Sequence, residues 1–169
     1  MNTDSTQLKQ LVVTAMFIAL GVLLAPLVSF PLGGARVFPL QHMINVLLVL
    51  LVGWRYSVAG AFCISSIRIA MGVGTLLAYP GSMIGAFLSG LVYQRTHSLI
   101  GAVLGEIIGT GIIGGLISYP IAAFILNSKA VALYTLIVAF LPNTIIGAIA
   151  AAIIYMVLPV EKLKQMLHS

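Results

Sequence analysis

Residues 101–115 read GAVLGEIIGTGIIGG, an apolar run that holds a single acidic residue, Glu106. Its glycines recur at intervals of four: Gly101, Gly105 and Gly109, then Gly111 and Gly115. Small residues at this spacing let neighbouring helices approach closely, and they also leave room for a flat ligand beside Glu106 and Thr110. The run therefore predicts a helix that is tightly packed inside a membrane bundle.

The composition of the whole chain agrees with this prediction. Of the 169 residues, 61% are hydrophobic and 7% are charged, with a mean hydropathy of +1.18. A soluble domain carries about 25% charged residues, so the bilayer must be the solvent for most side chains. The basic residues are scattered singly, which argues against a nucleic-acid partner. Cys63 is the only cysteine, so no intrachain disulfide is possible.

The apolar segments are separated by proline, glycine and charged residues. Since about 20 residues cross the hydrocarbon layer, they predict one all-α transmembrane domain over residues 1–169, with about six spans. The predicted spans are Leu8–Ser29, Pro39–Trp54, Ser57–Gly72, Ser82–Gln94, Ser98–Ala123 and Val131–Leu158.

The basic residues predict the orientation of these spans. With the N-terminus inside, one side collects Lys9, Arg55, Arg95, Lys162 and Lys164, and the other holds Arg36 and Lys129, with Arg68 near it. The positive-inside rule therefore favours an N-in, C-in protein of a cell membrane. The first two outer connectors are long and rich in Gly, Pro and aromatic residues, so we look for a site on the outer side.

The first outer connector leads into the second span through FPLGGARVFPLQHMIN, residues 30–45. Gln41, His42 and Asn45 fall on one helical face, either as a polar cap at the headgroups or as the wall of a pocket. Phe30 and Phe38 flank the Gly33–Gly34 pair. We expect the segment before the helix to be an aromatic lid hinged on the glycines.

Two charged residues lie at membrane depth, Arg68 and Glu106. A charge at that depth must be paired or hydrated and faces the bundle interior. The sequence leaves two alternatives open: a structural ion pair between them, or contact of at least one of them with a ligand.

Other polar residues are placed in the later spans. Asn143 follows Pro142 and either repairs the helix kink or points into a cavity. Tyr79, Tyr119 and Tyr134 gather toward the outer end, where tyrosines are often belt residues at the interface. Most of the polar groups at membrane depth thus lie in the outer half of the protein. A mostly apolar pocket with a few such groups suits a small, nearly neutral heterocyclic ligand.

Catalytic motifs are absent from the sequence. There is no HExxH, no GxSxG and no phosphate-binding glycine loop followed by Lys. We therefore expect no enzymatic activity, no cofactor and no metal.

The first span contains AMFIA, in which Ala15 and Ala19 lie four residues apart on one helix face. This surface allows another helix to dock closely, although packing within the chain would use it equally well.

With these residues in view, the chain resembles the substrate-binding S component of an energy-coupling factor (ECF) transporter. The first-span AxxxA, the long first outer loop and the small size are similar to that class. The segments GGARVFPLQHMINV, GTLLAYPGSMIGA and GEIIGTGIIGG resemble the ThiW family, whose proposed substrate is hydroxyethylthiazole, the thiazole precursor of thiamin.

The resemblance implies an S-component-like bundle in a prokaryotic plasma membrane. It also implies a transmembrane coupling subunit that contacts Ala15 and Ala19, and two cytoplasmic ATPases. The ligand would lie in the outer half, beneath the first loop. The expected ligand-contacting residues are His42, Asn45, Arg68, Tyr79, Glu106, Tyr119 and Asn143, with Tyr79 or Tyr119 stacking on the ring. The alternatives are a solitary small secondary transporter and an S component for another vitamin, such as thiamin.

Overall fold

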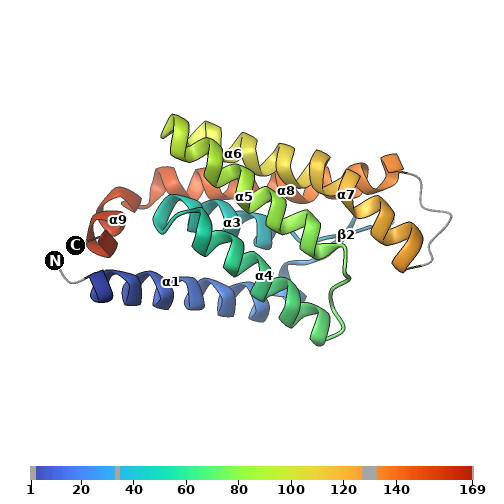
Figure 1. The fold of residues 1–169 in the computed structure, drawn as a ribbon, viewed down its shortest axis with the longest axis horizontal. Coiled ribbons are helices and arrows are strands. Elements are labelled where there is room, and N and C mark those ends of the chain that lie inside the picture. The colour runs from blue at the N-terminus through green and yellow to red at the C-terminus, as the bar shows by residue number, and fades with distance from the viewer. Residues whose placement is uncertain (1–2, 33–34, 127–132, 169) are drawn as a thin grey trace.

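Helices run back and forth along the long axis of the molecule, and a short β-hairpin lies away from the end where α1 begins (Figure 1). The computed structural model describes residues 3–32, 35–126 and 133–168. In chain order the elements are α1 (Thr3–Leu23), α2 (Ala25–Val28), β1 (Phe30–Leu32), β2 (Ala35–Val37), α3 (Pro39–Leu51), α4 (Trp54–Ala70), α5 (Ala78–Thr96), α6 (Leu99–Glu106), η1 (Ile107–Gly114), α7 (Gly115–Pro120), η2 (Ile121–Ile125), α8 (Leu133–Val157) and α9 (Val160–His168).

Each predicted span corresponds to a helix or to a continuous series of helical segments. Within the part of the chain that the structure describes, three helical stretches are long and apolar enough to cross a membrane: Ser5–Leu23, Leu99–Ile125 and Tyr134–Val157. The helix at Pro39–Leu51 is apolar but shorter. The prediction of a helical membrane protein is therefore confirmed, whereas the number of six spans stays a prediction.

Two features depart from the predicted architecture. The connector before α3 contains an antiparallel hairpin in which Phe30 pairs with Val37 and Leu32 with Ala35, so the described chain is not purely helical. The Gly33–Gly34 pair, predicted as a hinge, lies outside the described residues. The second departure is α9, a short helix that follows the last span and was not predicted from the sequence.

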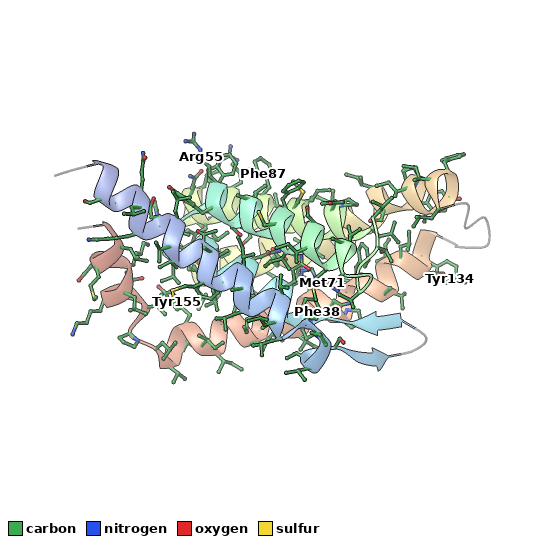
Figure 2. The ribbon with its side chains drawn as sticks, turned by 90° about the horizontal axis from the view of Figure 1, so that it is seen from below. Phe38, Arg55, Met71, Phe87, Tyr134 and Tyr155 are labelled. Carbon is green, nitrogen blue, oxygen red and sulfur yellow. The ribbon has the colours of Figure 1, made fainter. Side chains whose placement is uncertain are left out.

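The distribution of side chains is inverted relative to a soluble protein. Large apolar side chains cover the outside; Phe124 is 83% exposed and Leu27 is 80% exposed. Polar side chains are enclosed, and Glu106 and Asn45 are both 0% exposed. Side chains project from the helices over the visible face, and Tyr134 points away from the bundle (Figure 2). This inversion is what a hydrocarbon solvent requires.

Helix α3 is the centre of the bundle. It packs against α4, α5 and α8, and its residues from Ile44 to Leu51 are buried. Because α3 is surrounded by helices, the polar residues in its first two turns face the protein interior rather than lipid. The end of the bundle that carries the hairpin therefore receives a cluster of buried polar groups.

Helix α5 and the α6–η1 segment approach each other through glycine. A Cβ atom at Gly105 would lie 2.7 Å from the Cα of Ser89, and one at Gly109 would lie 2.8 Å from the Cα of Gly85. Only glycine allows such an approach. The packing interpretation of the glycine spacing is thus confirmed, and the helix changes to a π-helix directly after Glu106.

The start of α1 and helix α9 lie at the same end of the bundle (Figure 1). The start of α4, with Arg55, and the end of α5, with Arg95, lie at that end too. Most of the basic residues assigned to the cytoplasm thus share one end, while the assignment of that end to the cytoplasm stays a prediction.

Candidate functional site

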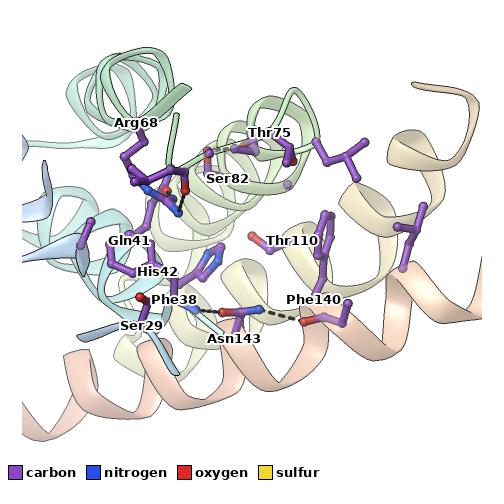
Figure 3. Close-up of a pocket in the computed structure, with 18 of the residues that line it drawn as sticks. Ser29, Phe38, Gln41, His42, Arg68, Thr75, Ser82, Thr110, Phe140 and Asn143 are labelled. Carbon is purple, nitrogen blue, oxygen red and sulfur yellow. Dashed lines mark hydrogen bonds between the residues drawn. The ribbon is translucent and has the colours of Figure 1, made fainter. Parts of the chain in front are cut away.

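A cavity of about 350 Å³ lies where the hairpin meets the first turn of α3 (Figure 3). Its walls come from α2, α3, α4, α5, η1, α8 and the connector between α4 and α5. The side chains that carry polar groups into its wall are Ser29, Gln41, His42, Arg68, Thr75, Ser82, Thr110 and Asn143. The rest of the wall is mostly apolar, and Phe38 and Phe140 supply its aromatic rings.

Asn143 fastens the junction between β2 and α3 to helix α8. Its Oδ1 accepts a hydrogen bond from the backbone N–H of Phe38, and its Nδ2 donates to the carbonyl of Ala139 at 2.8 Å (Figure 3). A buried backbone N–H without a partner would cost free energy comparable to a lost hydrogen bond. Asn143 therefore holds the hairpin end against α8 while it also lines the cavity.

Arg68 is held at the cavity wall from three sides. Its Nη1 donates to Oε1 of Gln41 at 2.7 Å, and its Nη2 donates to the carbonyl of Val73 at 3.4 Å. Its guanidinium carbon lies 4.0 Å from the centroid of the Phe38 ring, a cation–π contact. These contacts orient a permanent positive charge beside the cavity.

Gln41 continues this network into helices α4 and α5. Its Nε2 donates to Oγ of Ser65 at 2.9 Å, and the hydroxyls of Ser65 and Ser82 lie 3.1 Å apart. Because Arg68 occupies Oε1 and Ser65 accepts from Nε2, the orientation of the Gln41 amide is determined by its partners.

His42 and Glu106 form the second polar group of the site. Nδ1 of His42 lies 2.9 Å from Oε1 of Glu106, and the same oxygen accepts from Nδ2 of Asn45 and Oγ1 of Thr110, both at 3.1 Å. Asn45 also donates to the carbonyl of Ser82 at 3.1 Å. These three contacts on one oxygen orient the carboxyl group and, through it, the imidazole ring, whose Nε2 makes no hydrogen bond within the described part of the chain.

The partner of Glu106 settles one alternative that the sequence left open. Among the described residues, Glu106 forms an ion-pair contact with His42 and not with Arg68. Of the two alternatives that the sequence left open, a structural ion pair between Arg68 and Glu106 is therefore excluded. Arg68 lies with Gln41, while Glu106 lies deeper, behind His42.

The residues expected to contact a ligand fall into three groups, two of which lie at or directly behind the cavity wall. Three residues line the cavity: His42, Arg68 and Asn143. Two lie behind its wall and are fully buried: Asn45 and Glu106.

The two expected stacking residues lie away from the cavity. Tyr79 donates to or accepts from the hydroxyl of Ser66 at 3.0 Å and packs against Phe62, 5.5 Å between ring centroids. Tyr119 is 38% exposed on the outside of the bundle. Neither belongs to the cavity lining in the described residues.

Several lining residues were not among the expected ones. Gln41 was recognised only as part of the polar face, and Ser82, Thr75 and Phe140 were missed as lining residues. Helical spacing could have indicated Phe140, because it lies one turn before Asn143. No pattern in the sequence indicates that Thr75 reaches the same cavity.

Within the described ranges, no group of three or more His, Cys, Asp or Glu side chains is placed to hold a metal ion. The donors of the site are imidazole, amide, hydroxyl and guanidinium groups. Such groups bind an organic molecule through hydrogen bonds.

The fold and the cavity define an integral membrane protein that encloses a small polar-edged cavity between its helices. A family model described as "Thiamine-precursor transporter protein (ThiW)" matches residues 11–161. The chain therefore belongs to the ThiW family of thiamine-precursor transporters, as the resemblance predicted. This is a family of transporters and not an enzyme family. No curated protein and no solved structure matches it.

Proposed function

We propose that the chain is the substrate-binding S component of an ECF transporter and that its substrate is hydroxyethylthiazole. The observation that supports this most is the cavity beneath the hairpin. Its volume of about 350 Å³ is at the small end of ligand pockets, and its wall is mostly apolar with a few oriented polar groups. A thiazole ring carrying a hydroxyethyl arm offers an apolar body, one ring-nitrogen acceptor and one hydroxyl.

In this proposal the ligand contacts are made by His42, Arg68 and Asn143, which line the cavity. Glu106 and Asn45 act from behind, because they hold the imidazole in one orientation. The His42 ring projects between Thr110 and Asn143 (Figure 3), so its Nε2 is available for a hydrogen bond with the hydroxyl of the ligand, which can both donate and accept.

Isothermal titration of the purified protein tests the substrate. We expect tight binding of hydroxyethylthiazole and much weaker binding of intact thiamin. Tight binding of thiamin, or of an unrelated vitamin, together with no binding of hydroxyethylthiazole, would overturn the substrate assignment. Calorimetry is preferable to tryptophan fluorescence, since Trp54 begins α4 and stacks edge-on against Phe87 at 5.4 Å, outside the cavity lining.

The partner part of the proposal concerns helix α1. Ala15 and Ala19 are exposed on its surface, as a docking face for a coupling subunit requires. Ala15→Trp should abolish co-purification with the coupling subunit and the two ATPases and leave hydroxyethylthiazole binding unchanged. The matched control is Ala59→Trp on α4, where the alanine is exposed as well. Equal loss of assembly in both variants would contradict a specific docking face on α1.

Reconstitution separates this function from that of a solitary transporter. Liposomes that contain only this chain should bind hydroxyethylthiazole but should not accumulate it, and uptake should require the partner subunits and ATP. Concentrative uptake by the chain alone, driven by an ion gradient, would favour a secondary transporter instead.

A further inference from the structure

The acidic residues of the chain are few, and their positions limit the charge of any ligand. The sequence contains three: Asp4, Glu106 and Glu161. Asp4 lies in the first turn of α1, about 30 Å along the helix from the cavity residue Ala25. Glu161 lies in α9, at the same end as the start of α1 (Figure 1), and accepts a hydrogen bond from the hydroxyl of Tyr155. Both positions are therefore remote from the cavity.

Glu106 is the third, and its carboxyl group does not line the cavity. It is 0% exposed, and its Oε1 accepts from Asn45 and Thr110 and lies 2.9 Å from Nδ1 of His42. The protein's own side chains therefore engage this oxygen, and the imidazole of His42 lies between it and the cavity.

The ionisable groups that do line the cavity, among the described residues, are His42 and Arg68. The Arg68 guanidinium is always charged. Gln41 and the Phe38 ring hold it in place, so it cannot swing away from a bound cation without breaking a 2.7 Å hydrogen bond and a cation–π contact. One face of the Phe38 ring, which could otherwise have received a cationic ligand, is already covered by Arg68.

From this charge distribution we infer that the cavity accepts an uncharged heteroaromatic ring and rejects the same ring once its nitrogen is alkylated to a cation. Arg68 is the specificity-determining residue. This inference rests on the proposed function and goes beyond the identity of the substrate. The site would distinguish a neutral thiazole from the thiazolium of the finished vitamin by charge.

The expected size of the effect follows from the dimensions of the cavity. A sphere of its volume is about 9 Å across, so a ring-bound charge would lie about 6 Å from the guanidinium. Two like charges at that distance, with an effective dielectric constant of about 20, repel strongly enough to weaken binding about 100-fold.

Three probes test the inference by isothermal titration on the intact protein. The first is hydroxyethylthiazole, the second is its N-methyl thiazolium salt, and the third is 2-(3,4-dimethylthiophen-2-yl)ethanol. The third probe has the shape of the second without its charge. We expect the thiophene to bind within about tenfold of hydroxyethylthiazole, because it loses one hydrogen bond, and the thiazolium to bind about 100-fold more weakly than the thiophene.

The variant Arg68→Gln should reduce the difference between thiophene and thiazolium to less than about tenfold. Arg55→Gln, at the opposite end of α4, is the matched control and should leave the difference unchanged. If Arg68→Gln does not fold, the comparison of the three probes on the wild-type protein still decides whether the cavity rejects the cation.

Equal binding of thiophene and thiazolium would overturn the inference and leave the proposed function standing. Loss of binding for both the thiophene and the thiazolium would also overturn the inference, because the shape of the two probes rather than the charge of one would then exclude them. If hydroxyethylthiazole does not bind either, the proposed substrate fails, and the charge inference fails with it.

Discussion

Replacing Gly85 with alanine should damage both the packing of α5 and the polar site behind the cavity. A Cβ atom at Gly85 would lie 2.0 Å from Oγ1 of Thr110 and 2.8 Å from Oε1 of Glu106. The two helices, or the two side chains, would have to separate by about 1.5 Å to restore a normal contact. The hydrogen bonds of Glu106, which measure 2.9 and 3.1 Å, cannot all survive such a shift.

The magnitude of the effect can be estimated from these contacts. Overpacking a close-packed interior costs about 1–3 kcal/mol, and losing at least one hydrogen bond to a charged group adds about 1.5–3 kcal/mol. We expect Gly85→Ala to lower the free energy of unfolding by about 3–5 kcal/mol in total. Freeing the His42 side chain should also weaken hydroxyethylthiazole binding about 3- to 10-fold, the cost of immobilising one side chain again on binding.

Thermal unfolding in detergent, followed by circular dichroism, measures the first effect, and isothermal titration measures the second. Gly60→Ala is the matched control, because the close contact of a Cβ atom there is with the end of the Leu48 side chain, at 2.9 Å, while Thr14 and Ile18 lie at ordinary contact distance. That variant should cost about 1 kcal/mol or less and should bind ligand normally. If the two variants lose the same stability and both keep wild-type affinity, Gly85 does not support the site in the way described.

Three further substitutions test other parts of the site. Glu106→Leu should lower the free energy of unfolding by about 3 kcal/mol, because it leaves buried donors without their acceptor. Glu106→Gln should cost less, and Glu161→Gln almost nothing. Thermal unfolding measures this ranking, and any other order would contradict the role of Glu106. Asn143→Leu leaves the buried N–H of Phe38 without its acceptor and should cost about 1–3 kcal/mol, with faster hydrogen exchange at the Phe38 amide; unchanged exchange would speak against the anchor. Tyr119→Ala should leave the dissociation constant of hydroxyethylthiazole within about twofold, measured by titration, since Tyr119 lies outside the cavity; a loss of tenfold or more would restore it as a ligand contact.

The sequence predicted the fold class because membrane insertion depends on properties that act locally. Apolar length and the spacing of proline, glycine and charge indicate where a helix can cross a bilayer. The glycine spacing around Glu106 likewise indicated a close helix contact, and the structure places Gly105 and Gly109 against the backbone of α5. The hairpin escaped prediction because its strands are three residues long each and lie among prolines and glycines.

Which residues contact a ligand stays a prediction. Of the residues expected to do so, His42, Arg68 and Asn143 line the cavity, because polar groups at membrane depth have to face the interior. Their partners were not predictable: the charges of Arg68 and Glu106 suggested a mutual pair, yet each is engaged by a different residue of α3.

The sequence by itself thus determined that this chain is a helical membrane protein of the ThiW family, and which polar residues must face inward. The tertiary structure decided which of them share a cavity and which support it from behind. The physical reason is that helical period and hydropathy determine the depth and the face of each side chain within its own helix, whereas the rotation and distance between helices depend on packing across the bundle. Gln41 and His42 are neighbours in the chain, but the packing of α3 against α4 directs one to Arg68, and its packing against α6 directs the other to Glu106.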